Sequence, residues 1–421
     1  MSRSRVPVTP EERAPLLEAR REAKMTSSAH VYVRGSTHRF YDWLLSSRGE
    51  SLPKAPAIWI GGDCHLGNFG PLARTDGAIE LGLRDLDQTV IGSPAHDIVR
   101  LALSMAMAIR ASGLPGATTL RAVERVARGY ERVLEASAAR REFVIGPAPE
   151  QVTRLLRMAG HRSRKELLNE RVGVEERGVI PIGKRFWPLT DEERRGVEEL
   201  AATEKFRKLV TSLTSRSDRD RVQLLDAAYW VKGCSSLGLW RCAALVRVGG
   251  GRKGRALAIV DIKEAHAPLA PRARGARLPK HDGQRVVAGA RKLSPYLGSR
   301  MIAASVLGKP VSVRELLPQD LKFEMHRITD ADGREMAAYM GSVVGIAHAR
   351  QLAPAQCATW LATLRKESAN GSTAPAWLWA AIVDLVALHE GAYLEHCRKH
   401  LSVAESTPGA TNVVSHHVPD G

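Results

Sequence analysis

The chain has 421 residues, a hydrophobic content of 44% and a formal net charge of +17. This length allows two or three domains with a large buried core. The charge favours an anionic partner such as a nucleotide, although an arginine-rich composition alone could account for it. None of the five cysteines forms a C-x-x-C pair, which argues against a structural zinc site or a disulfide framework and predicts a reducing, cytoplasmic compartment.

Residues 1–25 are a polar lead-in with a short amphipathic helix expected over 10–24. They contain no apolar segment typical of a signal peptide. No uninterrupted apolar run elsewhere reaches the length of a membrane span, so we expect no such span. At the other end, the composition of residues 403–421 predicts a disordered tail.

Four blocks lie between these ends. Residues 26–115 read as a helix, a strand at "PAIWI", a loop, a short hairpin and a helix from Asp97. Residues 116–225 have helical periodicity, residues 226–325 become β-like with a glycine-rich hairpin at "GGGRKG", and residues 326–402 are helical again. This order predicts an α+β protein of two lobes, with the sequence of one lobe split around the other.

The segment "GGDCHLGNFG" places three polar side chains after an apolar strand. Asp63 and Asn68 are separated as in the catalytic loop of protein kinases, where the Asp accepts the proton of the attacking hydroxyl and the Asn holds Mg²⁺. A hairpin with its turn expected at 76–77 then leads to Asp85, where kinases place their second magnesium ligand. His65 is expected to support the loop.

Three nearby residues are predicted to support the site. Asp97 opens an apolar helix, so its simplest role is to satisfy free backbone N–H groups at the start of that helix. Asp87 is a second carboxylate beside Asp85, or a simple turn residue. Arg34 is expected to form a salt bridge with the loop or to contact substrate.

A later segment supplies a candidate phosphate lid. In "VKGCSSLGLWRCAALV", glycines between two strands let backbone N–H groups approach phosphate oxygens. A Lys in the apolar strand "ALAIVDIKEA" requires an anion opposite it. The candidate nucleotide-binding residues are Gly233, Ser235, Ser236, Gly238 and Lys263.

These motifs carry two resemblances. "GGDCHLGNFG" followed by "LRDLDQTVIGSPAHDI" resembles the catalytic segment of aminoglycoside and choline kinase-like phosphotransferases. More closely, the chain resembles the bacterial family called domain of unknown function 2252 over roughly residues 25–400. The segments that match it in order are "RGS" at 34–36, "GDCHLGNFG" at 62–70, "RDLDQ" at 84–88, "KGCSSLG" at 232–238, "IKEA" at 262–265, "GQRVV" at 283–287 and "AHAR" at 347–350.

The resemblance implies a two-lobed protein-kinase-like fold with an unusual order of parts. In kinases the glycine loop and the lysine precede the catalytic loop, whereas here they follow it. We therefore expect a circular permutation, with "VRELLP" at 313–318 as the hinge; an unrelated fold for the late block is the alternative. The family's glutamate after G-Q-R-V-V is replaced by Ala288, so the partner of Lys263 is expected at Asp261, Glu264 or Glu315.

The expected function is an ATP- and Mg²⁺-dependent phosphotransferase that acts on an unidentified small-molecule or protein hydroxyl. A nucleotidyl (AMP) transferase on the same fold and a catalytically weak, nucleotide-binding regulatory protein are alternatives. A metal-dependent hydrolase would use Asp63, His65, Asp85 and Asp87. The sequence shows no platform of basic and aromatic residues, which disfavours a nucleic-acid partner.

Overall fold

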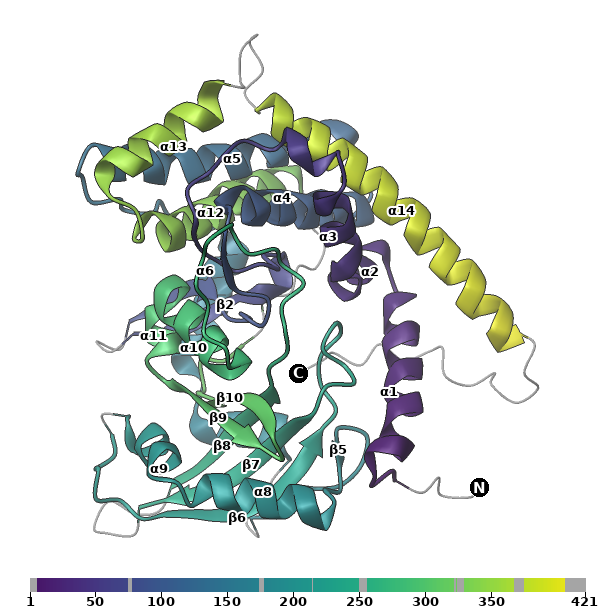
Figure 1. Cartoon of the computed structure of the whole chain (residues 1–421), viewed down its shortest axis with the longest axis vertical. Coiled ribbons are helices and arrows are strands. Elements are labelled where there is room, and N and C mark those ends of the chain that lie inside the picture. The colour runs from purple at the N-terminus through teal and green to yellow at the C-terminus, as the bar shows by residue number, and fades with distance from the viewer. Residues whose placement is uncertain are drawn as a thin grey trace.

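The structure is a computed structural model with a helical lobe and a sheet lobe (Figure 1). It describes residues 6–74, 78–173, 178–213, 215–249, 256–321, 323, 329–366 and 375–405. The mixed α+β class predicted from the sequence is confirmed. The predicted turn at 76–77, most of the glycine-rich hairpin at 249–254 and the tail from residue 406 lie outside the described residues.

The sheet lobe is built on a six-stranded antiparallel sheet with the strand order β5-β6-β7-β8-β10-β9. Its strands are β5 (Phe186–Trp187), β6 (Val222–Trp230), β7 (Arg241–Val248), β8 (Ala256–Glu264), β9 (Met301–Val306) and β10 (Lys309–Glu315). Helices α8 (Asp191–Ala201) and α9 (Glu204–Thr211) cover one face. Alternation along β8 turns Val260 and Ile262 into the core with these helices, and therefore turns Asp261 and Lys263 to the opposite face.

The helical lobe surrounds a nearly fully buried helix, α4 (Pro94–Ala111). The helices that contact it are α2 (Ala29–Gly35), α3 (Thr37–Leu45), α5 (Gly116–Ala138), α12 (Asp330–Ala349) and α14 (Ala376–Glu405). Helix α13 (Pro354–Lys366) packs against α5. Helices α5 and α12 approach closely because Gly129 and Gly341 face each other's backbone. A Cβ on Gly129 would lie 2.0 Å from the carbonyl oxygen of Ala338, and one on Gly341 would lie 2.2 Å from that of Val126.

Two short antiparallel ladders hold the segment that carries the predicted site. Strand β1 (Ile58–Ile60) pairs with β4 (Val90–Gly92), and β2 (Phe69–Ala73) pairs with β3 (Ile79–Leu83). A 3-10 turn, η2 (Leu66–Asn68), leads into β2. The predicted strand, loop and hairpin are therefore present, and both ladders lie between the helices of one lobe and the sheet of the other.

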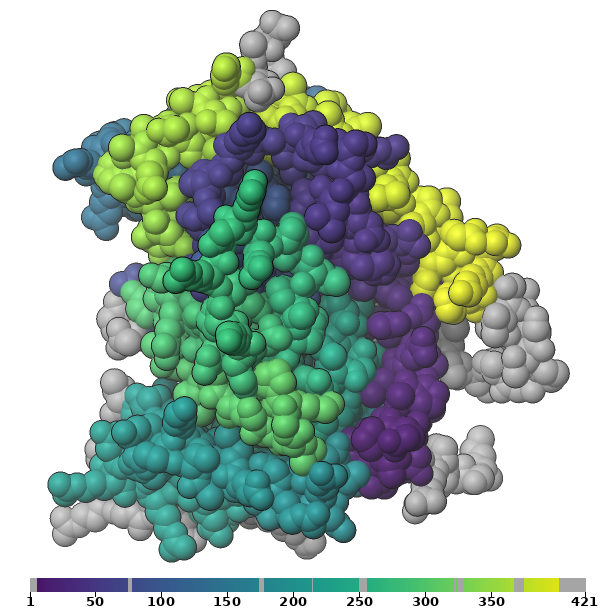
Figure 2. Space-filling view, in the orientation of Figure 1, coloured from purple at the N-terminus to yellow at the C-terminus, as the bar shows by residue number. Residues whose placement is uncertain are grey.

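Several helices and strands do not follow the predicted block boundaries. The block 116–225 also contains α6 (Glu150–His161) and α7 (Arg164–Arg171), but its last part, β5 with α8 and α9, builds the sheet lobe. Within the block 226–325, α10 (Asp282–Leu293) and α11 (Pro295–Gly298) interrupt the strands. The helix expected over 10–24 is confirmed as α1 (Pro10–Met25), with a capping box between Thr9 and Glu12. It lies along the side of the sheet lobe (Figure 2).

One helix among the described residues, Ala376–His400 of α14, is long and apolar enough to cross a membrane by length and composition alone. The absence of a membrane span stays a prediction, because the core helix of a soluble protein meets the same criteria. Trp377, Leu378, Ile382 and Leu385 of this helix are buried in the main hydrophobic core. Its first half is therefore packed into the helical lobe.

Candidate functional site

The backbone after β1 is held by a buried carboxylate from α4. Gly61 and Gly62 donate their N–H groups to Asp97 at 2.7 and 2.9 Å, and His348 Nε2 lies 3.1 Å from the same carboxylate. Gly62 has a φ of +76°, and a Cβ there would lie 2.1 Å from the carbonyl oxygen of Gln88. The predicted helix-start role of Asp97 is therefore corrected, since its carboxylate binds the loop and Ser93 caps α4.

Asp63 is held from two sides. Its Oδ1 accepts a hydrogen bond from Arg100 Nε at 2.8 Å, and its Oδ2 accepts one from Thr37 Oγ1 at 3.1 Å. Burial raises the pKa of Asp63, although Arg100 and Thr37 act in the opposite direction. The predicted base is thus a rigid, partnered carboxylate, while it still lines a cavity described below.

Asn68 and His65 complete the loop. Asn68 Nδ2 donates to the main-chain oxygen of Asp63 at 2.6 Å, which leaves the amide oxygen for another ligand. Burial and the nearby arginines lower the pKa of His65 well below its usual value, so its imidazole is neutral. Its Nε2 lies 3.8 Å from Asp63 Oδ2, in keeping with the expected supporting role.

Arg34 lies against the loop but does not form the predicted salt bridge. A Cβ on Gly67 would lie 2.5 Å from the guanidinium of Arg34, so only glycine admits this contact. No carboxylate pairs with Arg34 within the described residues. Its side chain instead borders a cleft between the lobes.

Lys263 reaches from the sheet to the loop between β3 and β4. Its Nζ lies 3.4 Å from Asp85 Oδ1 and forms an ion pair with Asp87. This result corrects the three predicted partners. Asp261 shares the face of Lys263 but accepts two hydrogen bonds from Arg241. The other two carboxylates are also bound elsewhere: Glu264 by Lys309, and Glu315 by Arg164 and Arg216.

The pairing shifts the acidity of both aspartates. Burial raises the pKa of Asp85, but Lys263, Arg241 and Arg314 outweigh it and hold the pKa at about 2. Burial and the nearby Asp85 raise the pKa of Asp87, against the effect of Lys263. Although protein surrounds both residues, the side chain of Asp85 keeps 48% exposure, whereas that of Asp87 keeps 16%. Asp85 therefore presents the more accessible carboxylate of the two.

The Lys263–Asp85 pair predicts a pH dependence of stability. Because the pKa of Asp85 is lowered from 3.8 to about 2, the pair stabilises the fold above pH 4 and loses this contribution as the pH falls toward 2. We expect Lys263→Met to unfold at lower urea concentration than wild type at pH 7, with a smaller difference at pH 3. A difference that is constant or larger at pH 3 would contradict this assignment.

A cleft lined by many basic side chains, called here the basic cleft, opens between the lobes. Its described lining residues include seven cations: Lys24, Arg34, Arg84, Arg171, Lys232, Arg241 and Arg314. Asn68, Asp85 and the predicted loop residues Gly233, Ser235 and Ser236 line the same cleft. Gly233 has a φ of +121°, which a side chain would strain.

Two further cavities adjoin the basic cleft. One lies beside Lys263, Asp85 and Asp87. The other, called here the second cavity, is lined by Asp63, His65, Asn68, Asp85, Asp87, Arg21, Ser235, Ser236 and other residues. Asn68 and Asp85 thus border both the basic cleft and the second cavity. Gly238 lines none of the three, so its predicted ligand contact is not supported by this geometry.

Sequence reasoning missed residues that act through distant partners. Arg100 lies within the apolar run of α4, and a charge in such a run signals a buried partner. Thr37 gave no such signal. The arginines of the basic cleft come from α2, the end of the hairpin, α7 and the sheet, so no local motif unites them.

A family model described as "Uncharacterized protein conserved in bacteria (DUF2252)" matches residues 13–399. The chain belongs to this family. The DUF2252 match includes every predicted site residue, from Arg34 to Lys263, and both lobes. No curated protein and no solved structure matches the chain.

Proposed function

We propose that this DUF2252 protein is an ATP- and Mg²⁺-dependent phosphotransferase with a circularly permuted, kinase-like arrangement. The observation that carries the proposal is the meeting of Lys263 and Asp85. A sheet lysine and a hairpin aspartate, far apart in the chain, pair beside a basic cleft that Asn68 and the Gly233 loop also line. This combination of groups is what phosphoryl transfer requires.

The basic cleft fits a polyphosphate. Arginine guanidinium groups bind phosphate oxygens in a bidentate manner, and the Gly233 loop brings the backbone to the same space. Magnesium prefers oxygen ligands and keeps part of its water shell. The amide oxygen of Asn68 and the carboxylate of Asp85 would hold this ion, which would neutralise phosphate charge.

The arrangement of helix α10 supports the permuted reading. It packs against β9 and β10 of the sheet and against β1 of the catalytic segment. In kinases a helix beside the sheet carries the glutamate that pairs with the lysine. Here Ala288 lies on α10 and offers no carboxylate, and Lys263 pairs with Asp85 and Asp87 instead. An incoming nucleotide would have to share or displace that pairing.

The second cavity is the proposed site of the hydroxyl acceptor. Asp63 lines this cavity but not the basic cleft, and Asn68 and Asp85 line both spaces. Arg100 and Thr37 fix the position of Asp63, so this residue would orient the acceptor hydroxyl and take its proton.

The partners of Asp63 also favour a second candidate function. Both of its oxygens already accept hydrogen bonds, and these bonds oppose the rise in the pKa of Asp63 that burial causes. Nucleotidyl (AMP) transfer, or nucleotide binding for regulation, would depend less on this base. The hydrolase reading has weaker support, since Asp63, His65, Asp85 and Asp87 bring no three ligand atoms together within the described part of the chain.

The proposal predicts Mg²⁺-dependent stabilisation of the purified protein by ATP. At a ligand concentration of about 100 Kd, binding to the native state adds about 2.7 kcal/mol. We expect the melting temperature to rise with ATP and Mg²⁺ together and to rise less with either alone. ATP labelled on the γ-phosphate or on the α-phosphate then separates phosphoryl from nucleotidyl transfer. No shift with any nucleotide would refute both functions.

A further inference from the structure

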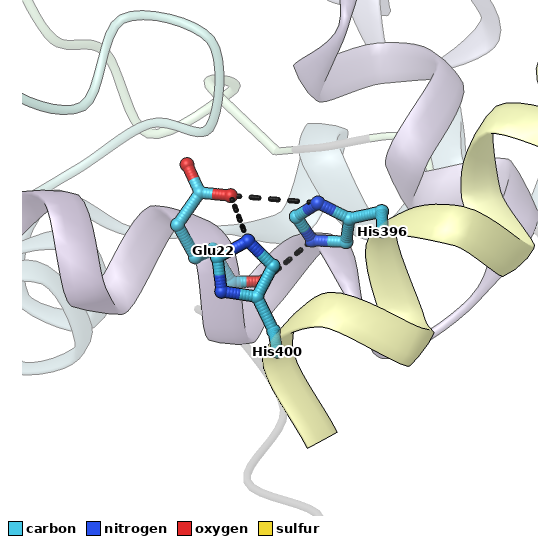
Figure 3. Close-up of side chains that lie close together, drawn as sticks. All are labelled: Glu22, His396 and His400. Carbon is cyan, nitrogen blue, oxygen red and sulfur yellow. Dashed lines mark hydrogen bonds and ion pairs between the residues drawn. The ribbon is translucent and has the colours of Figure 1, made fainter. Parts of the chain in front are cut away.

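A second cluster of ligand-type side chains lies where the N-terminal and C-terminal helices meet (Figure 3). Glu22 comes from α1, and His396 and His400 come from successive turns of α14. Glu22 Oε2 lies 3.5 Å from His396 Nδ1 and 3.3 Å from His400 Nε2. Three ligand atoms from two helices, brought together from opposite ends of the chain, therefore face one small space.

The hydrogen bonds around this cluster orient its ligand atoms. His396 Nε2 lies 3.2 Å from the main-chain oxygen of Glu22, and only a protonated nitrogen can donate to a carbonyl. In the neutral ring, Nδ1 therefore presents its lone pair to the carboxylate. Arg21 donates to the other oxygen, Oε1, so that Oε2 is left for the histidines. A metal ion bound to both atoms would complete this contact.

We propose that Glu22, His396 and His400 bind a divalent transition-metal ion of the zinc class. Zinc bonds to imidazole nitrogen and carboxylate oxygen are about 2.0–2.2 Å long, which places neighbouring tetrahedral ligands about 3.3–3.5 Å apart. The separations of Glu22 Oε2 from the two histidine nitrogens match this spacing. The hydrogen bond from His396 to a carbonyl is the usual outer-shell support of a metal-bound histidine.

The burial of the three residues suits an accessible site. The side chains of His396, Glu22 and His400 are 9%, 19% and 31% exposed. An ion can enter from solvent, and water can occupy a fourth position. Cys397 is not part of the cluster, although its Sγ lies 4.0 Å from the carbonyl oxygen of Thr26 at the end of α1.

The metal would fasten α1 to α14 beside the candidate active site. The neighbours of Glu22 on α1 border the site, since Arg21 lines the second cavity and Lys24 lines the basic cleft. Tyr393 already joins the helices by donating to the carbonyl oxygen of Thr26 at 2.9 Å. Metal binding would therefore fix the position of α1, whose Arg21 and Lys24 line the second cavity and the basic cleft.

The test is a titration of the full chain with Zn²⁺ alone, by calorimetry, after chelator treatment. His416 and His417 are replaced by alanine in every variant, because two adjacent histidines in the tail could bind zinc by themselves. We expect one Zn²⁺ per chain and a rise in melting temperature that EDTA reverses. Glu22→Gln and His400→Gln should each lower the affinity by at least the roughly 10- to 100-fold that loss of an outer-shell partner costs.

His161→Gln is the matched control, because this exposed histidine lies on another helix, outside the cluster, and should leave the affinity unchanged. Co²⁺ in place of Zn²⁺ gives a readout that needs no variant, namely the intense visible absorption of a four-coordinate ion. Weak, unsaturable zinc binding would overturn the proposal, as would equal affinity in Glu22→Gln, His400→Gln and the parent. The cluster would then be a contact between two helices that holds no metal.

Discussion

Asp85→Asn is expected to remove the Mg²⁺-dependent part of ATP stabilisation and to lower the transfer rate by at least about 100-fold. The carboxylate is half exposed at the boundary between the basic cleft and the second cavity. The amide keeps its size but loses the negative charge that an ion requires. Melting curves with ATP, with and without Mg²⁺, measure the first effect, and the rate at which ATP loses its labelled γ-phosphate measures the second.

Stability measurements separate this effect from damage to the fold. Lys263 keeps its pairing with Asp87 in the variant, and Asp85 is half exposed, so the free energy of unfolding should change by about 1 kcal/mol or less. Asp42→Asn is a matched control, since Asp42 is exposed on α3 and lines none of the three cavities. If Asp85→Asn retained full Mg²⁺-dependent stabilisation, Asp85 would not be the metal ligand.

Asp97→Asn is expected to lower the free energy of unfolding by about 3–5 kcal/mol, because fully buried donors lose a charged acceptor. The carboxylate accepts the N–H groups of Gly61 and Gly62 and contacts His348. An amide has one oxygen, so one of the two glycine N–H groups would face an NH₂ group. The loop that carries Asp63 should therefore open before the rest of the fold.

Urea unfolding measures the total loss, and amide exchange at Gly61 and Gly62 locates it. Ser93→Ala is the matched control on the same helix, because it removes only the cap of α4 at a cost of about 1 kcal/mol. A variant Asp97→Asn within 1 kcal/mol of wild type, with slow exchange at both glycines, would show that the loop does not depend on this carboxylate.

The local features of the molecule follow from the sequence by itself. Helix α1 is specified by its capping box and polar spacing, and β8 by its alternation of apolar and charged residues. The approach of Asp63 to Asn68 is likewise local, since a turn brings together residues that are five apart. The helix over 10–24 and the strand "ALAIVDIKEA" were expected because both depend on backbone geometry within a few residues, whereas the capping box and the Asn68–Asp63 hydrogen bond were found in the structure.

The partners of the charged groups were decided only by the tertiary structure. Asp261 and Glu264 adjoin Lys263 on β8, yet Arg241 from β7 binds Asp261, and Glu264 points to the other face. Lys263 therefore takes its carboxylates from a hairpin of the other lobe.

The binding spaces depend on the same long-range placement. The basic cleft gathers side chains from α1, α2, the hairpin, α7 and the sheet. The Glu22–His396–His400 cluster joins the two ends of the chain. Each of these groups exists because packing of the lobes fixes side chains that are remote in sequence. Spacing along the sequence does not determine the distances between these remote side chains, so only the tertiary structure defines them.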